Sequence, residues 1–129
     1  PWGGALARLV LGPERCFEPR NADQATHWTA CYPPGALLPM MALVEHVKMI
    51  DLQVIEVPTL VIYSREDKIV DPMETERIIP TLRSGLVSTH LVEDSGDPEN
   101  HVLAGDAVSP GTTDRVRAHI LDTLESRLR

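Results

Sequence analysis

The sequence predicts an α/β fold in which strands of a parallel sheet lie between helices. Two segments, 57–63 and 87–92, are rich in β-forming apolar residues, and helical segments precede, separate and follow them. This order of helix, strand, helix, strand and helix is typical of sheets whose parallel strands are joined by helices. Residues 60–63 are consecutive apolar residues, which favours a strand buried on both faces inside such a sheet.

The first helix is expected over residues 39–51. Pro39 suits the first turn, because an N–H there has no helical partner to lose. The apolar residues that follow recur at helical spacing, and we interpret them as facing the core: Met40, Leu43, Val44, Val47 and Ile50.

Two further helices follow the predicted strands. One is expected over about 73–79 and should end near Pro80, while Asp71 and Pro72 begin it. The last should begin near Thr112 or Thr113, and its apolar stripe is formed by Val116, Ile120, Leu121, Leu124 and Leu128.

Residues 1–35 form a less regular region, interrupted by prolines and glycines. A short helix is expected between Asn21 and Cys31, with Asn21 as its N-cap. A long structured loop of this kind indicates a lid or an excursion from a larger fold. Two strands make a poor sheet alone, so we expect further strands upstream of this sequence.

Composition narrows the classes of function. The 129 residues suffice for one modest core. Lys and Arg number 12 against 19 Asp and Glu, and the net charge of −7 disfavours nucleic-acid binding. No apolar run approaches the ~20 residues of a membrane span, and no secretory signal is visible. Cys16 and Cys31 are expected to be reduced thiols, which favours a cytoplasmic protein.

Two polar loops follow the predicted strands, over residues 64–72 and 94–106. In open α/β sheets the reactive groups lie beyond the C-terminal ends of the strands. The first loop carries acids and the second carries His101, so these two loops are the expected place for chemistry.

The motifs in these loops resemble those of a known superfamily. Residues 57–63, then Asp67, then residues 69–72 are similar to the acid loop of the α/β-hydrolases. Ser95-Gly96, followed by His101-Val102-Leu103 and Asp106, is similar to their histidine loop. The order of acid before histidine is that of the superfamily. The resemblance covers about residues 37–129 and is closest to carboxylesterases, monoacylglycerol lipases and lysophospholipases.

The resemblance implies a fold and roles for two residues. The fold would be the C-terminal part of the three-layer α/β-hydrolase core over residues 39–129, with residues 1–38 as part of a cap. His101 would be the general base and Asp67 would orient it, in preference to Glu66 or Asp71. The reaction would be hydrolysis of a small carboxylic ester without a cofactor.

The chain departs from the family pattern in two ways. Residues 97–100 intervene between the Ser95-Gly96 pair and His101, where the family histidine follows directly. No glycine is followed two positions later by Ser or Cys, so the nucleophile elbow is absent. We therefore expect a missing N-terminal half to supply the serine, and the isolated chain to be inactive.

Other interpretations stay open at this stage. A metal site could use the acidic loops, although the acids fit no EF-hand spacing, and His27 with Cys31 has no second ligand pair. A non-catalytic binding or interaction domain would explain an incomplete sheet, whose unpaired edges would favour self-association. The apolar residues Trp2, Phe17, Trp28 and Tyr32 would line an acyl site if residues 1–38 are a cap. The remaining histidines are interpreted as structural or surface residues: His27, His46, His90 and His119.

Overall fold

The computed structural model describes residues 12–83 and 85–128, and it divides the chain into two compact units. One unit ends at Asp51 and the other runs from Leu52 to Arg129. The division falls after the first long helix, whereas the sequence placed the boundary between residues 38 and 39. Trp2, which was assigned to the predicted acyl site, lies outside the described residues.

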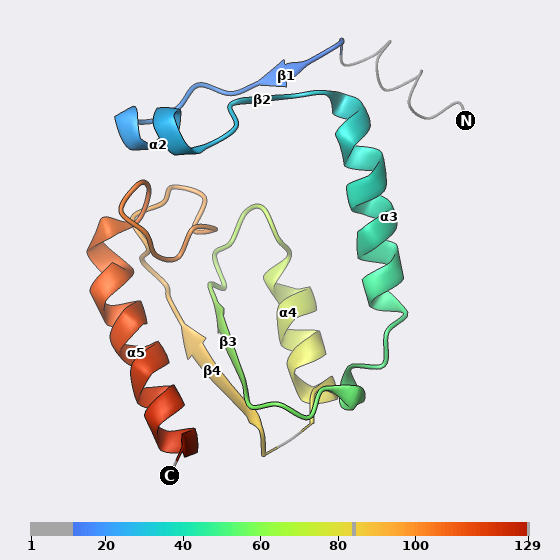
Figure 1. Cartoon of the computed structure of the whole chain (residues 1–129), viewed down its shortest axis with the longest axis vertical. Coiled ribbons are helices and arrows are strands. Elements are labelled where there is room, and N and C mark those ends of the chain that lie inside the picture. The colour runs from blue at the N-terminus through green and yellow to red at the C-terminus, as the bar shows by residue number, and fades with distance from the viewer. Residues whose placement is uncertain (1–11, 84, 129) are drawn as a thin grey trace. The chain divides into compact units, whose positions relative to one another are not determined.

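The first unit contains a short antiparallel pair of strands, β1 (Arg15–Cys16) and β2 (Cys31–Tyr32) (Figure 1). Helix α2 (Ala22–His27) connects them. Asn21 caps this helix as predicted, since its side-chain oxygen accepts a hydrogen bond from the backbone N–H of Gln24 at 2.8 Å.

The two cysteines form a disulfide, so the prediction of reduced thiols is wrong. Cys16 and Cys31 are directly opposed in the ladder between β1 and β2, with their Cα atoms 4.1 Å apart. The cysteines are 15 positions apart, and the strands that pair them are only two residues long, too short to have a recognisable pattern in the sequence. Reduced thiols were the reason to expect a cytoplasmic protein, and the disulfide removes that reason.

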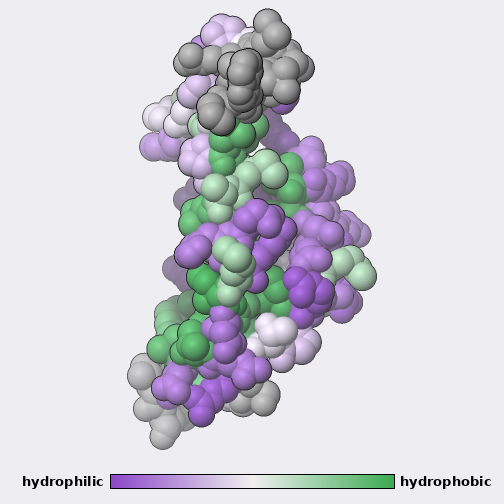
Figure 2. All heavy atoms as spheres, turned by 90° about the vertical axis from the view of Figure 1, so that its right-hand side faces the viewer, coloured by the Kyte–Doolittle hydropathy of each residue, from purple (hydrophilic) through white to green (hydrophobic). Residues whose placement is uncertain are grey.

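Helix α3 (Leu37–Lys48) confirms the first predicted helix, although it ends earlier than residue 51. The prediction that its apolar stripe packs into a core is wrong for the described residues. None of its residues is buried, and four members of the stripe are between 47% and 61% exposed: Met40, Leu43, Val44 and Val47. Figure 2 shows such hydrophobic side chains at the surface. The stripe has the right period, but no element described within its own unit buries it.

The second unit is built on two parallel strands, β3 (Thr59–Tyr63) and β4 (Val87–Leu91). Their register pairs Thr59 with Val87 and Tyr63 with Leu91. Helix α4 (Pro72–Ile78) lies between them in the sequence, and α5 (Pro110–Leu128) follows β4. Short 3₁₀ helices occupy Pro34–Ala36, Leu52–Val54 and Ile79–Thr81. The fold is therefore mixed α/β with a small parallel sheet, as the order of elements predicted.

The two α-helices of this unit, α4 and α5, contact opposite faces of the sheet. Alternate residues of a strand point to opposite faces. On one face, Ser88 accepts a hydrogen bond from Arg127 of α5 at 3.1 Å, and the ring of His90 stacks on that of His119 of α5. On the other face, the Tyr63 hydroxyl donates to Glu76 of α4 at 3.2 Å. Helix, sheet and helix thus form three layers.

The sheet is smaller and less buried than the sequence predicted. All five residues of β3 are half-buried, and among the described residues β4 is its only partner. The fully buried apolar core is correspondingly small and includes Val92 and Val116. Among the residues that the structure describes, no helix combines the length and the hydrophobicity of a membrane-spanning segment.

The disulfide yields a first prediction. Purified without reductant, the chain should not react with iodoacetamide until a reducing agent is added. Reduction should lower the stability of the first unit by roughly 3 kcal/mol, because a cross-link that closes a loop of this length restricts the unfolded chain. A C16S/C31S double variant should show the same lower stability with or without reductant. Alkylation of either cysteine without reductant would contradict the assignment.

A second prediction concerns the imidazole pair between β4 and α5. The ring centroids of His90 and His119 are 3.8 Å apart, and His90 Nε2 is buried without a hydrogen-bond partner. Burial lowers the pKa of His90, and electrostatic interaction with His119 and Arg115 lowers it further. Glu93 and Asp94, which follow β4, line the same hollow with His90 and Arg115.

Since folding depresses this pKa, the unfolded chain takes up the proton more readily. The stability that neutral His90 contributes is fully present above the pKa of this residue in the unfolded chain, near 6.5. That stability is lost as the pH falls through the lower pKa of His90 in the folded chain. The urea midpoint should therefore fall on acidification, less steeply in His90→Gln than in the exposed-helix control His46→Gln. Equal slopes in the two variants would refute this account.

Candidate functional site

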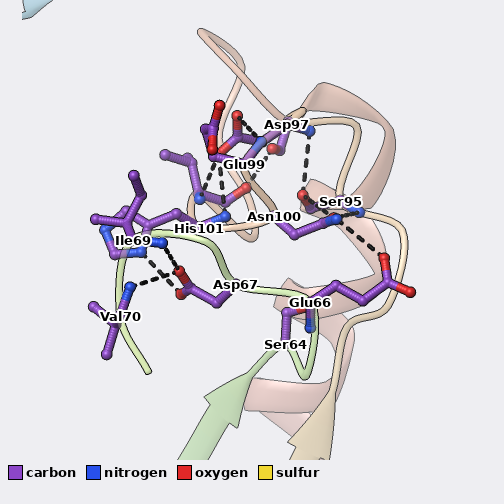
Figure 3. Close-up of polar contacts among 12 residues, drawn as sticks. Ser64, Glu66, Asp67, Ile69, Val70, Ser95, Asp97, Glu99, Asn100 and His101 are labelled. Carbon is purple, nitrogen blue, oxygen red and sulfur yellow. Dashed lines mark hydrogen bonds and ion pairs between the residues drawn. The ribbon is translucent and has the colours of Figure 1, made fainter. Parts of the chain in front are cut away.

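The candidate site lies where the loops after β3 and β4 meet, at the C-terminal ends of the two strands (Figure 3). The Asp67 carboxylate, from the loop after β3, contacts His101, from the loop after β4. Asp67 Oδ2 and His101 Nδ1 are 2.9 Å apart. The two residues that the sequence singled out are 34 positions apart in the chain, and the parallel pairing of β3 with β4 brings their loops together.

The local fold of the acid loop fixes the Asp67 carboxylate. Its Oδ1 atom accepts hydrogen bonds from the backbone N–H groups of Ile69 at 2.8 Å and Val70 at 2.9 Å. Two N–H groups on one oxygen leave Oδ2 to face the imidazole. Ile69 and Val70 hold the carboxylate through their backbone, while the two residues are themselves 63% and 48% exposed.

The environment of Asp67 favours its charged form. Burial by itself would raise the pKa of this carboxyl group. The hydrogen bonds from Val70, His101 and Ile69 outweigh burial, and the pKa is lowered from its ordinary value. Asp67 is therefore an ionised acceptor at neutral pH, which is the form that can hold an imidazole N–H.

The exposures of the two side chains differ. The Asp67 side chain is 14% exposed, and that of His101 is 42% exposed. The imidazole is the more accessible of the two side chains, so His101 is better placed than Asp67 to meet a molecule outside the loop. The pair can therefore orient a base, but it contains no nucleophile.

The two other acids that were weighed against Asp67 have different partners. Glu66 accepts a hydrogen bond from the side-chain amide of Asn100 at 3.3 Å. Asp71 is the N-cap of α4, where it accepts from the backbone N–H of Met73 at 2.9 Å, and Pro72 is in the first turn, as predicted. The structure therefore brings Asp67, rather than either neighbour, to His101.

The intervening segment 97–100 folds into a tight turn that the sequence did not predict. The Asn100 N–H donates to the Asp97 carbonyl at 2.8 Å, and Asn100 has a φ of 48°, in the left-handed region that asparagine tolerates. Asp97 as a whole residue is only 4% exposed. An Asp followed by Pro is a recognised turn signal, which could have indicated this geometry.

The acid loop and the histidine loop are also joined away from the contact between Asp67 and His101. The Lys68 N–H donates to the Glu99 carbonyl at 2.9 Å, and its Nζ donates to the Pro98 carbonyl at 2.7 Å. On the far side of the histidine loop, the Thr112 hydroxyl donates to the Leu103 carbonyl at 2.8 Å. The Ser109 hydroxyl donates to the carbonyl of Val102. Loop and helix thus hold both sides of His101.

The structure gives the metal interpretation little support. Among the described residues, the one group of three ligand-type side chains whose donor atoms lie within 4.8 Å of one another is Glu14, Cys16 and Cys31. Both sulfur atoms of that group are joined in the disulfide, so neither is a thiolate ligand. The acidic loops contribute no such group in this part of the chain.

Comparisons with known proteins add no relative. No family model, curated protein or solved structure matches the chain.

The site yields a third prediction. In Asp67→Asn, the side-chain oxygen can still accept from Ile69 and Val70, but the amide NH₂ then faces His101 Nδ1. The imidazole should therefore move its proton to Nε2, and the ring ¹⁵N chemical shifts should report this change of tautomer. The free energy of unfolding should fall by about 1–2 kcal/mol, because a charged hydrogen bond is lost.

Asp71→Asn is the matched control for this variant. It removes the same charge from the same loop, and asparagine caps a helix as well as aspartate does. Its His101 ring shifts should equal those of the unaltered chain. If Asp67→Asn also leaves those shifts unchanged, the proton of His101 is not directed by Asp67.

Proposed function

We propose that this chain supplies the acid and the histidine of a serine hydrolase that acts on carboxylic esters, and that it is the C-terminal part of an α/β-hydrolase core. The observation that carries the proposal is the 2.9 Å contact between Asp67 Oδ2 and His101 Nδ1. The contact joins two loops that follow adjacent parallel strands, in the chain order that this superfamily uses.

The chemistry assigns one task to each side chain. If the Nδ1–H group of His101 donates a hydrogen bond to Asp67, the Nε2 atom carries no proton. Nε2 would then take the proton from a serine hydroxyl and later return it to the leaving alcohol. Asp67 would stabilise the imidazolium formed in between. Its lowered pKa supports this task, because a carboxyl group that is already ionised can balance the positive charge.

The serine would come from a segment outside this sequence. In the described part of the chain, β3 has a strand partner on one edge alone. A parallel strand added at the other edge would bring its own C-terminal loop beside those that hold Asp67 and His101. That is a suitable position for a nucleophile elbow. The half-buried residues of β3 and the exposed apolar face of α3 support further elements that cover them.

The proposed substrate is a small carboxylic ester, such as a monoacylglycerol or a lysophospholipid. The resemblance supports this class, and residues 1–38 would be part of the cap that selects the acyl chain. Phe17 and Trp28 from this segment are 38% and 40% exposed and offer apolar contact surface. No cofactor enters the proposed reaction.

A second candidate is a non-catalytic interaction domain with a hydrolase-like fold. The same open edge of β3 and the exposed stripe of α3 favour association with another chain. This candidate requires no upstream serine, so the coding sequence before residue 1 separates the two. A Gly-x-Ser-x-Gly motif there would support the hydrolase.

The fourth prediction tests the hydrolase directly. The longer protein should be labelled by a fluorophosphonate probe at its serine, and the 129-residue chain alone should not be labelled. His101→Ala in the longer protein should slow labelling on the order of 10³-fold, because the general base is removed. His46→Ala, on the exposed helix α3, should leave the rate unchanged. Unlabelled longer protein, or equal rates in both variants, would refute the proposed function.

A further inference from the structure

The buried Asp97 carboxylate accepts three backbone hydrogen bonds within the histidine loop. Its Oδ2 atom accepts from the backbone N–H of His101 at 3.1 Å and from that of Val102 at 3.0 Å. Its Oδ1 atom accepts from the N–H of Glu99 at 3.2 Å. The Asp97 N–H in turn donates to the hydroxyl of Ser95 at 3.2 Å. One side chain therefore binds three backbone N–H groups in the loop around the histidine.

These contacts divide the positioning of His101 between two acids. Asp67 holds the ring through Nδ1, whereas Asp97 holds the backbone that carries the ring. The ring position depends on both, because a side chain of two rotatable bonds can reach Asp67 only from a limited range of backbone positions.

The position of Asp97 explains how the longer loop still delivers His101. The turn closed between Asp97 and Asn100 folds back on itself, so residues 97–100 do not extend the path from Ser95 to His101. The Ser95 hydroxyl also donates to the side-chain oxygen of Asn100 at 3.3 Å, across the base of the turn. The additional residues 97–100 thus include Asp97, the side chain that binds the backbone of the histidine.

We propose that Asp97 is a positioning residue of the triad: its carboxylate, by binding the backbone N–H groups of His101 and Val102, keeps the His101 ring on Asp67. The inference rests on the proposed hydrolase for its consequence in catalysis. The positioning itself is a property of the 129-residue chain and can be measured without substrate.

The fifth prediction uses Asp97→Asn, which keeps the size of the side chain but replaces one acceptor oxygen with a donor NH₂. At least one of the three N–H groups then loses its acceptor. Amide hydrogen exchange at Glu99, His101 and Val102 should accelerate by roughly tenfold or more, since exchange follows local opening. In addition, the His101 ring ¹⁵N shifts should move from a single Nδ1–H form towards a mixture of tautomers.

Asp94→Asn is the matched control, because it removes the same charge from an exposed position in the same loop. It should leave both the exchange rates and the ring shifts unchanged. The tautomer is the decisive readout, since a merely structural role for Asp97 would alter exchange and stability without moving the ring proton. A single Nδ1–H form retained in a folded Asp97→Asn variant would overturn the proposal.

A measurement on the unaltered chain guards against a variant that fails to fold. During an acid titration, the amide resonances of His101 and Val102 should shift together with the carboxyl carbon of Asp97. Amide resonances that do not follow that carbon would also overturn the proposal.

In the longer protein, Asp97→Asn should lower kcat with little change in KM. Failure to label that protein would count against the hydrolase alone and would leave the positioning result standing.

Discussion

The contact between the Asp67 carboxylate and the His101 ring is the interaction on which the functional account depends. It requires two loops to meet, and the loops meet because β3 and β4 are adjacent and parallel. Parallel strands end at the same edge of a sheet, so the segments that follow them share one surface. A change of register or strand direction would separate the two side chains. The contact between the two side chains is thus a consequence of the sheet topology.

Most of the hydrogen bonds that hold Asp67 and His101 in place involve backbone groups. Each of the two acids that position His101 accepts at least two backbone N–H bonds, Asp67 in the loop after β3 and Asp97 in the loop after β4. Such bonds use the polar groups that a loop must satisfy in any case. The same contacts therefore shape the loops and aim the ring. Lys68 then joins one loop to the other through two carbonyl groups.

Sequence reasoning predicted features that depend on local pattern. The Asn21 cap, the Pro72 helix start and the two strands of the βαβ unit all follow from short-range preferences, and the structure contains them. The proximity of Asp67 and His101 could be predicted because the motifs stood after two strands in the required order. Their catalytic roles stay predictions, because proximity alone does not perform a reaction.

Features that depend on long-range pairing were missed. The disulfide arises from the pairing of two strands too short to have a periodic pattern. The stripe of α3 has helical period, but a period does not reveal whether a facing element exists. Asp97 was missed for a different reason: its partners are local, but they are backbone N–H groups, which carry no mark in the sequence.

The most direct test of the central claim is a crystal structure of the longer protein after reaction with a fluorophosphonate. The account predicts that the modified serine lies beside this sheet edge, with His101 Nε2 within about 3 Å of the serine Oγ and Asp67 on the opposite side of the ring. A modified serine beside another histidine, with the Asp67–His101 pair remote from it, would contradict the account.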